Sequence, residues 1–195
     1  MSHTPNLPHQ DPIRHYLKKQ RYNLYLTKPV IEHLVHFIDG ATQKGFSGTP
    51  TDVNTLICER RHRTTWSHFL TRGVWDEQWM QHHLSQRSLR KIQKHAQRTG
   101  LPIYVILDDS VCEKTKPSSQ AVSAIQPADF HFSHGKGGPV WGHQVVVLLL
   151  RCGDRCLPFA FQRYDKDGVS KIALTCELLE LLPAFEHPAY LLMDS

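Results

Sequence analysis

The feature that most constrains the fold of this 195-residue chain is a change of hydrophobic period at Leu101. Before Leu101, apolar side chains recur at helical spacing. After it, they come in short continuous runs rich in Val, Ile and Leu. These patterns predict a helical region over residues 1–100 and a sheet region over residues 101–195. The expected class is α/β, or α+β for the chain as a whole, with a mixed sheet.

Glycine and proline divide the first region into several helices. We expect helices over residues 12–26 and at "VIEHLVHFI", and then two short ones, the first capped by Thr51 or Asp52 and the second by Thr64 or Thr65. The second short helix carries an apolar stripe, and a long helix over residues 76–99 carries another. These two stripes are Trp66, Phe69 and Leu70, and Leu89, Ile92 and Ala96.

The sheet region begins with "LPIYVIL", which predicts a strand buried on both faces. Residues 114–142 are rich in Pro, Gly and Ser and predict a long loop. Two strands should then form a hairpin around Gly153-Asp154, followed by a helix capped by Ser170 and by a last strand at "AYLLM".

Composition limits the cellular setting. The longest apolar run, Val145–Leu150, has six residues, far fewer than a membrane span needs, and the first residues hold no apolar signal segment. Five cysteines without a framework spacing favour a reducing compartment over a disulfide scaffold. We therefore expect a cytoplasmic protein that does not insert into a membrane.

Charge is distributed unevenly along the chain. Residues 1–100 hold 15 Lys and Arg against 7 Asp and Glu, whereas residues 101–195 hold 8 against 11. This asymmetry indicates a part that binds a polyanion and a part that binds cations. A basic surface that is merely solvated explains the first half equally well.

An arginine cluster lies in the stretch "ICERRHRTTW". If the flanking short helices form a helix-turn-helix, Arg60, Arg61 and Arg63 would lie near DNA phosphates. The alternative is an ordinary helical bundle with an arginine-rich connector, and periodicity does not separate the two.

Two apolar strands end in aspartate, one at "YVILDDS" and one at "YLLMDS". The carboxyl ends of strands in α/β proteins open into ligand crevices, so neighbouring strands would bring Asp109 or Asp108 close to Asp194. Because adjacent carboxylates repel, a divalent cation would stabilise them, and oxygen-only ligation suits Mg²⁺ or Mn²⁺. The alternative is that each aspartate caps a following turn.

Two weaker site signals remain. Cys152 and Cys156 have the C-x₃-C spacing of a zinc pair, but there is no second pair, so Cys112, His131, His134 or His143 would have to complete the site. Lys136 lies in "HGKGGP", which lacks the full phosphate-cradle pattern, but its ammonium group is a candidate phosphate contact.

Four stretches, "RTTWSHFL", "YVILDDSVCEKT", "GHQVVVLLL" and "YLLMDS", resemble the bacterial insertion-sequence transposases of the DDE class. The similarity is greatest to the insertion-sequence 4 and 701 groups. It implies a helical DNA-binding region followed by an RNase H-like domain, in which Asp, Asp and Glu hold two Mg²⁺ ions. Asp109, which directly precedes Ser110, corresponds to the first aspartate and Asp194 to the second, and Asp108 has a lower claim.

The resemblance also implies partners and an incomplete site. Double-stranded DNA at the element ends would be the substrate, and the full-length enzyme would work as a homodimer on it. The third residue, a Glu on a later helix, has no counterpart before the sequence ends at Ser195. The expectation is a truncated, inactive transposase. The alternative is a non-catalytic DNA-binding remnant that competes with the full-length enzyme.

Overall fold

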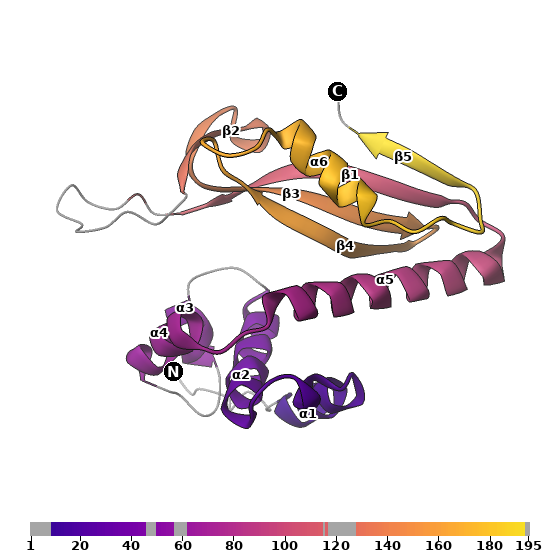
Figure 1. The fold of residues 1–195 in the computed structure, drawn as a ribbon. Helices are drawn as coiled ribbons and strands as arrows, with labels where there is room; N and C mark the ends of the chain where they lie inside the picture. Colours follow the sequence, from indigo (N-terminus) through magenta and orange to yellow (C-terminus); the bar gives the residue numbers. More distant parts are fainter. Residues whose placement is uncertain (1–8, 46–49, 57–61, 115, 117–127, 194–195) are drawn as a thin grey trace. The chain divides into compact units, whose positions relative to one another are not determined.

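The computed structural model describes residues 9–45, 50–56, 62–114, 116 and 128–193 (Figure 1). The chain divides into two compact units, with the boundary between Glu77 and Gln78. The architecture is mixed α/β, because the first unit is helical and the second is built on a five-stranded sheet. Among the helices of the described ranges, none has the length and apolar character to cross a membrane.

The longest helix of the first unit is α2 (Lys28–Lys44). It has Pro29 in its first turn and ends at Gly45, whose φ of +75° lies in the left-handed region that glycine adopts without steric cost. The other elements of this unit are α1 (Gln10–Lys19), the 3-10 turn η1 (Tyr22–Leu24), α3 (Pro50–Leu56) and α4 (Arg63–Arg72).

Several expected helix ends in this unit are wrong. The first helix stops at Lys19, since Arg21 adopts a left-handed conformation with φ of +63° and a 3-10 turn follows. α3 begins at Pro50, ahead of both residues expected to cap it. α4 is capped by His62, whose ring accepts a hydrogen bond from the Thr64 amide at 3.4 Å, so both threonines expected as caps lie inside the helix.

Aromatic packing joins α4 to α2. Trp66 and Phe69 are buried, and their ring centroids lie 6.0 Å from Phe37 and 4.9 Å from His33, respectively. Leu70, expected on the same stripe, is instead 46% exposed. It follows Phe69 directly and so projects about 100° further around the helix.

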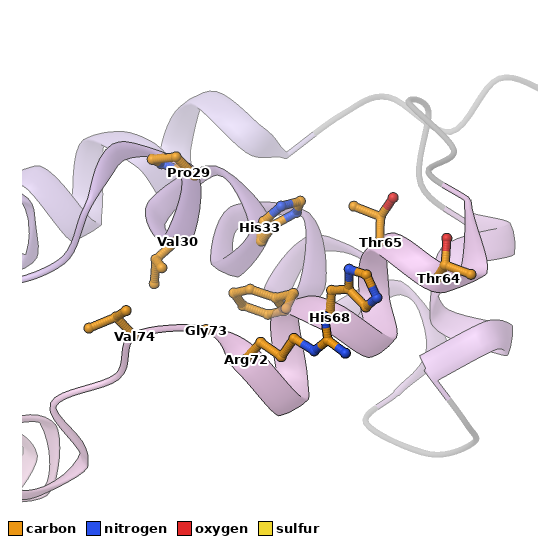
Figure 2. Close-up of a pocket in the computed structure, with 10 residues that line it drawn as sticks. Pro29, Val30, His33, Thr64, Thr65, His68, Arg72, Gly73 and Val74 are labelled. Atoms are coloured by element: carbon orange, nitrogen blue, oxygen red, sulfur yellow. The ribbon is translucent and has the colours of Figure 1, made fainter.

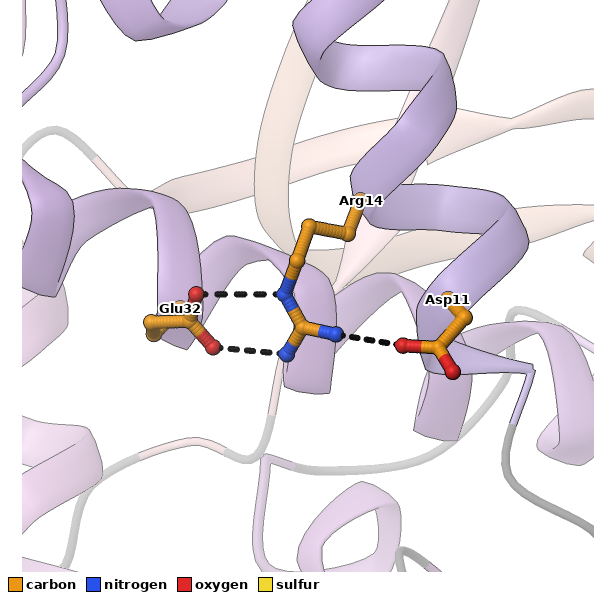
Figure 3. Close-up of polar contacts among 3 residues, drawn as sticks. All are labelled: Asp11, Arg14 and Glu32. Carbon is orange, nitrogen blue, oxygen red and sulfur yellow. Dashed lines mark hydrogen bonds and ion pairs between the residues drawn. The ribbon is translucent and has the colours of Figure 1, made fainter.

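A charged clamp joins α1 to α2. Arg14 donates two hydrogen bonds to the Glu32 carboxylate, at 2.8 and 3.2 Å, and a third to Asp11 at 2.8 Å (Figure 3). The hydrogen bond from Arg14 is the largest cause that holds the pKa of Glu32 below its ordinary value, and burial opposes it. Such paired geometry makes this ion pair better defined than a typical surface contact.

The second unit contains one long helix, a five-stranded sheet and one shorter helix. In chain order its elements are α5 (Glu77–Thr99), β1 (Ile103–Glu113), β2 (Asp129–Ser133), the 3-10 turn η2 (His134–Lys136), β3 (Gly138–Cys152), β4 (Arg155–Tyr164), α6 (Lys171–Glu180) and β5 (Ala189–Met193).

The sheet is mixed, and β3 lies at its centre. β1 pairs antiparallel with one side of β3, while β2 and β4 pair antiparallel with successive parts of β3. β5 pairs parallel with β1, in a register that sets Ile103 opposite Ala189 and Leu107 opposite Met193. The helix α6 connects β4 to β5, so the parallel strand returns beside the first strand of the sheet.

Burial alternates along β1. Ile103, Val105 and Leu107 are buried, whereas Tyr104 and Ile106 on the other face are only partly buried. The expectation of a strand buried on both faces is therefore wrong. The core joins the buried face of the sheet to both helices of this unit; its members include Leu89, Ile92 and Ala96 of α5, Leu148 and Leu150 of β3, and Leu174 and Leu178 of α6.

The strand expectations have mixed outcomes. The hairpin is confirmed, with Gly153 at φ of +58° in the turn between β3 and β4. The cap of α6 is also confirmed, because Ser170 Oγ accepts a hydrogen bond from the Ala173 amide at 3.1 Å. The expected long loop over residues 114–142 is wrong in its later part, where "DFHFS" forms β2 and "GPVWG" begins β3.

The helix α5 belongs to the sheet unit. Ser85 Oγ donates to the carbonyl oxygen of Phe159 at 2.6 Å, and Gln81 Nε2 donates to that of Phe161 at 3.0 Å. Both acceptors lie on β4, which pairs only with β3 among the described strands, so α5 satisfies polar groups of an edge strand. Along the sequence, the boundary between the compact units therefore falls at the start of α5, whereas the hydrophobic period changes after the end of α5, at Leu101.

Candidate functional site

Of the two adjacent aspartates of β1, only Asp109 faces the buried side of the sheet. Side chains alternate along a strand, so Asp109 shares its face with Val105 and Leu107, while Asp108 points the other way and is exposed. The Asp109 side chain is 35% exposed. It lies where the apolar part of that face ends and polar side chains begin. β1 itself continues to Glu113, so the expectation that this strand ends in aspartate is wrong.

Two side chains bind the same carboxylate oxygen of Asp109. Lys171 Nζ lies 2.5 Å from Asp109 Oδ2, and Gln144 Nε2 donates to the same oxygen at 2.9 Å. Lys171 is the first residue of α6, directly after the cap Ser170, and Gln144 is a buried residue of β3. A charged donor and a neutral donor thus hold one carboxylate from a helix and a neighbouring strand.

Two aromatic rings complete this group. Lys171 Nζ lies 5.5 Å from the ring centroid of Tyr164, a cation–π distance, and the Tyr164 ring lies 6.0 Å from that of His131. We call Asp109, His131, Gln144, Tyr164 and Lys171 the Asp109 cluster. Its members come from all the antiparallel strands and from α6, so folding alone brings them together.

His131 is the most enclosed titratable member of the cluster. Its side chain is buried, and its Nε2 atom has no hydrogen-bond partner within the described part of the chain. Burial is the largest cause that lowers the pKa of His131, followed by the nearby charge of Lys166, and a hydrogen bond with Gln144 opposes the shift. The neutral ring is therefore the favoured form at neutral pH.

The described residues fit a divalent cation only in part. Asp109 contributes a hard carboxylate ligand of the kind that Mg²⁺ prefers, but Lys171 already holds one of its oxygens. Over the described ranges, no three His, Cys, Asp or Glu side chains lie close enough to share a metal. The second expected ligand, Asp194, follows Met193 in the sequence and lies outside the described residues.

The expected DNA contacts are only partly described. Arg60 and Arg61 lie outside the described residues, and Arg63 begins α4 with a side chain that the structure does not describe. Lys136 lies in η2, where its ammonium group forms an ion pair with Glu113. Both partners are exposed, so this pair leaves Lys136 accessible to a stronger anion.

The zinc alternative does not fit the hairpin. Cys152 is opposite Arg155 and Cys156 is opposite Arg151, which sets the two thiols on opposite faces of the sheet. Cys152 is buried while Cys156 is exposed, and both are free thiols. Two ligands on opposite faces of one hairpin cannot share a zinc ion.

Lys171 and Gln144 are not among the predicted site residues, and His131 is predicted only as a candidate zinc ligand in an expected loop. The alternation in "DFHF" is a strand signal that places His131 on a sheet face.

A pocket lies in the helical unit. It has a volume of about 420 Å³ and opens between α2 and α4 (Figure 2). Its walls carry the cationic Arg72, the rings of His33 and His68 and the hydroxyls of two threonines, Thr64 and Thr65, above the buried ring of Phe69. None of the ten lining residues is acidic, so the pocket is chemically suited to an anion.

Comparison with protein-family models, with curated proteins and with solved structures finds no match to this chain.

Proposed function

We propose that this chain acts on DNA as an insertion-sequence transposase of the DDE class, with an RNase H-like catalytic domain. The observation that carries most weight is the position of Asp109. It lies just past the apolar part of β1, two residues beyond Leu107, which pairs with the last described residue of β5, the strand whose sequence continues into Asp194. β1 continues to Glu113, so the support is that parallel neighbouring strands run toward the same edge of a sheet, where a site of two aspartates would lie.

The chain order of the sheet supports the RNase H-like proposal. Four antiparallel strands, β1 to β4, of which β2 is a short one that among the described strands pairs only with the start of β3, are followed by the helix α6 and by β5, which returns parallel to β1. Asp109 therefore lies on a central strand with a paired neighbour on each side. A rigid central strand holds a catalytic carboxylate more firmly than a loop does.

Within this proposal, Asp109 is the first metal ligand and Asp194 the second. A bound Mg²⁺ or Mn²⁺ ion would neutralise charge on a phosphodiester during strand cleavage and transfer. Gln144 orients the Asp109 carboxylate through its 2.9 Å hydrogen bond. Asp108 has the weaker claim, because it points to the opposite, exposed side of β1.

The helical unit is proposed to bind the element ends. Its support is the anion-suited pocket lined by Arg72 and His68, together with a small basic excess of 10 Lys and Arg against 7 Asp and Glu over residues 1–77. The basic residues between 78 and 100 lie on α5, in the sheet unit. Arg60, Arg61 and Arg63 remain the proposed phosphate contacts of the connector, with Lys136 in the sheet unit.

A second candidate function is DNA binding without cleavage. The observation that favours it is the Lys171–Asp109 ion pair, which leaves the described site without a vacant carboxylate oxygen at Oδ2. In that case the chain would occupy element ends and compete with an active transposase.

The test is a binding and cleavage assay with the purified chain. Labelled duplexes that carry the inverted repeats flanking the coding sequence are compared with scrambled duplexes, with and without Mn²⁺. Cleavage of the repeats that Asp109→Ala abolishes and Asp108→Ala preserves would support the transposase. Repeat-specific binding without cleavage would favour the competitor. Equal, weak binding to both duplexes would contradict both proposals.

A further inference from the structure

An ion pair joins Lys171, the first residue of α6, to Asp109, which lies within β1. Lys171 Nζ lies 2.5 Å from Asp109 Oδ2, and the two residues are 62 positions apart in the sequence. The side chains are 41% and 35% exposed, so solvent reaches the pair. Because the ion pair is partly exposed, another cation can reach Asp109 and replace the Lys171 ammonium.

The Asp109 oxygen has no room for a further cation while Lys171 is present. Oδ2 already accepts the Lys171 ammonium and the Gln144 amide. A divalent cation on the same carboxylate would lie within a few ångströms of the ammonium, where like charges repel strongly. Ligation through Asp109 Oδ2 therefore requires that Lys171 leaves this oxygen.

We propose that Lys171 is the built-in counter-ion of Asp109, and that a divalent cation must displace it to bind. This inference rests on the proposed function, in which Asp109 is a metal ligand. Lys171 is thus a positioning residue: it holds the carboxylate in place without metal and weakens the affinity for the ion that replaces it. A lysine suits this exchange, since its ammonium ends a flexible stem.

The ring of Tyr164 gives the displaced side chain a second contact. The ring centroid lies 5.5 Å from Nζ, close enough for a cation–π contact. Lys171 can therefore move off the carboxylate and keep a partial partner. The structure explains in this way how a charged side chain leaves Asp109 without losing every favourable contact.

A neighbouring ion pair provides a matched control. Lys166 Nζ lies 3.0 Å from Asp129 Oδ2, and its side chain is 44% exposed, nearly the same as that of Lys171. Neutralising Lys166 removes the same charge from the same unit but leaves the Asp109 carboxylate paired. Any effect of Lys171 that this control does not share is therefore local to Asp109.

The experiment measures Mn²⁺ affinity of the full chain by isothermal titration calorimetry at neutral pH. The variants are Lys171→Met, Lys171→Arg, Lys166→Met and Asp109→Asn, each checked for folding by circular dichroism. We expect Lys171→Met to tighten Mn²⁺ binding by up to about fivefold, the range that a part-exposed ion pair accounts for. Lys171→Arg, which keeps the charge, and Lys166→Met should remain near the wild type.

The outcomes distinguish a failure of the counter-ion role of Lys171 from a failure of the metal site at Asp109. If Asp109→Asn removes Mn²⁺ binding but Lys171→Met leaves it unchanged or weakens it, the counter-ion role is wrong and the metal site stands. If Asp109→Asn leaves wild-type Mn²⁺ binding unchanged, the metal site itself is wrong and the counter-ion role falls with it. Equal tightening by Lys166→Met would show a general charge effect and would also overturn the role of Lys171.

Discussion

Leu107 and Met193 are paired across the parallel ladder of β1 and β5. In each strand the next residue of the sequence is an aspartate, Asp108 after Leu107 and Asp194 after Met193. Only Asp109, one position further along β1, shares the buried face with Leu107. Asp108 and Asp109 lie on opposite faces of β1, so the face that carries the metal site decides which of them is the ligand.

Exchanging each aspartate tests that choice of face. Asp109→Ala should abolish Mn²⁺ binding and lower the free energy of unfolding by about 1 kcal/mol or less, because the Lys171 ammonium is part-exposed and remains solvated. Asp108→Ala should change neither quantity measurably. Calorimetry and urea unfolding check both. A loss of binding in Asp108→Ala alone would show that the site lies on the other face.

The Arg14–Glu32 clamp should make stability depend on pH. The pKa of Glu32 is lowered in the folded chain, chiefly by the hydrogen bond from Arg14, so its stabilisation is present above the ordinary value of 4.5 and is lost as the pH falls through the folded pKa. Glu32→Gln should therefore cost about 0.5–1 kcal/mol at pH 7 and nearly nothing at strongly acidic pH.

Thermal unfolding of the full chain at several pH values measures this difference. Asp11→Asn is the control, because Asp11 also binds Arg14 but is 93% exposed and should contribute little at any pH. A Glu32→Gln difference that stays constant with pH would contradict the clamp.

The contact between α5 and β4 should be measurable through one hydroxyl. Ser85→Ala removes the buried hydrogen bond to the Phe159 carbonyl and leaves that oxygen without this donor, at a cost of about 1–3 kcal/mol. Ser88→Ala, the same change at a buried serine one turn later on the helix, should cost less. Urea unfolding gives both values, and equal costs would mean that the bond to β4 adds nothing.

DNA binding by the helical unit should weaken steeply with salt. For Z neutralised phosphates, the plot of log affinity against log salt has a slope of about −0.9Z, and Arg72→Gln should reduce the slope by about 0.9 if Arg72 binds one phosphate. Lys18→Gln removes the same charge from an exposed position of α1 and should leave the slope unchanged. Fluorescence anisotropy with a labelled duplex measures each slope, and salt-independent binding would contradict the proposal.

Local signals predicted much of the sheet unit. The Gly153 turn and the Ser170 cap each depend on a few adjacent residues, and both are confirmed. The stripe of α5 is also confirmed, because Ile92 and Ala96 are fully buried. Periodicity identified that stripe but not what it packs against, so α5 was assigned to the helical region although its core contacts lie in the sheet unit.

The partners of Asp109 lay beyond sequence reasoning. Gln144 and Lys171 are 35 and 62 residues from it, and only the register of β1 with β3 and the start of α6 bring them together. Strand register depends on the whole pattern of buried side chains. Because the segment of His131 was expected to be a loop, β2 is missing from the expected sheet, and so are the contacts that β2 makes.

The most direct test of the account is to locate a bound divalent cation. Mn²⁺ titrated into isotope-labelled chain broadens nuclear magnetic resonance signals near the ion. We expect the first signals lost to be those of Asp109, its neighbours on β1, Gln144 and Lys171. The Asp109→Asn variant should not show this loss. Broadening centred elsewhere, or unchanged in Asp109→Asn, would contradict the account.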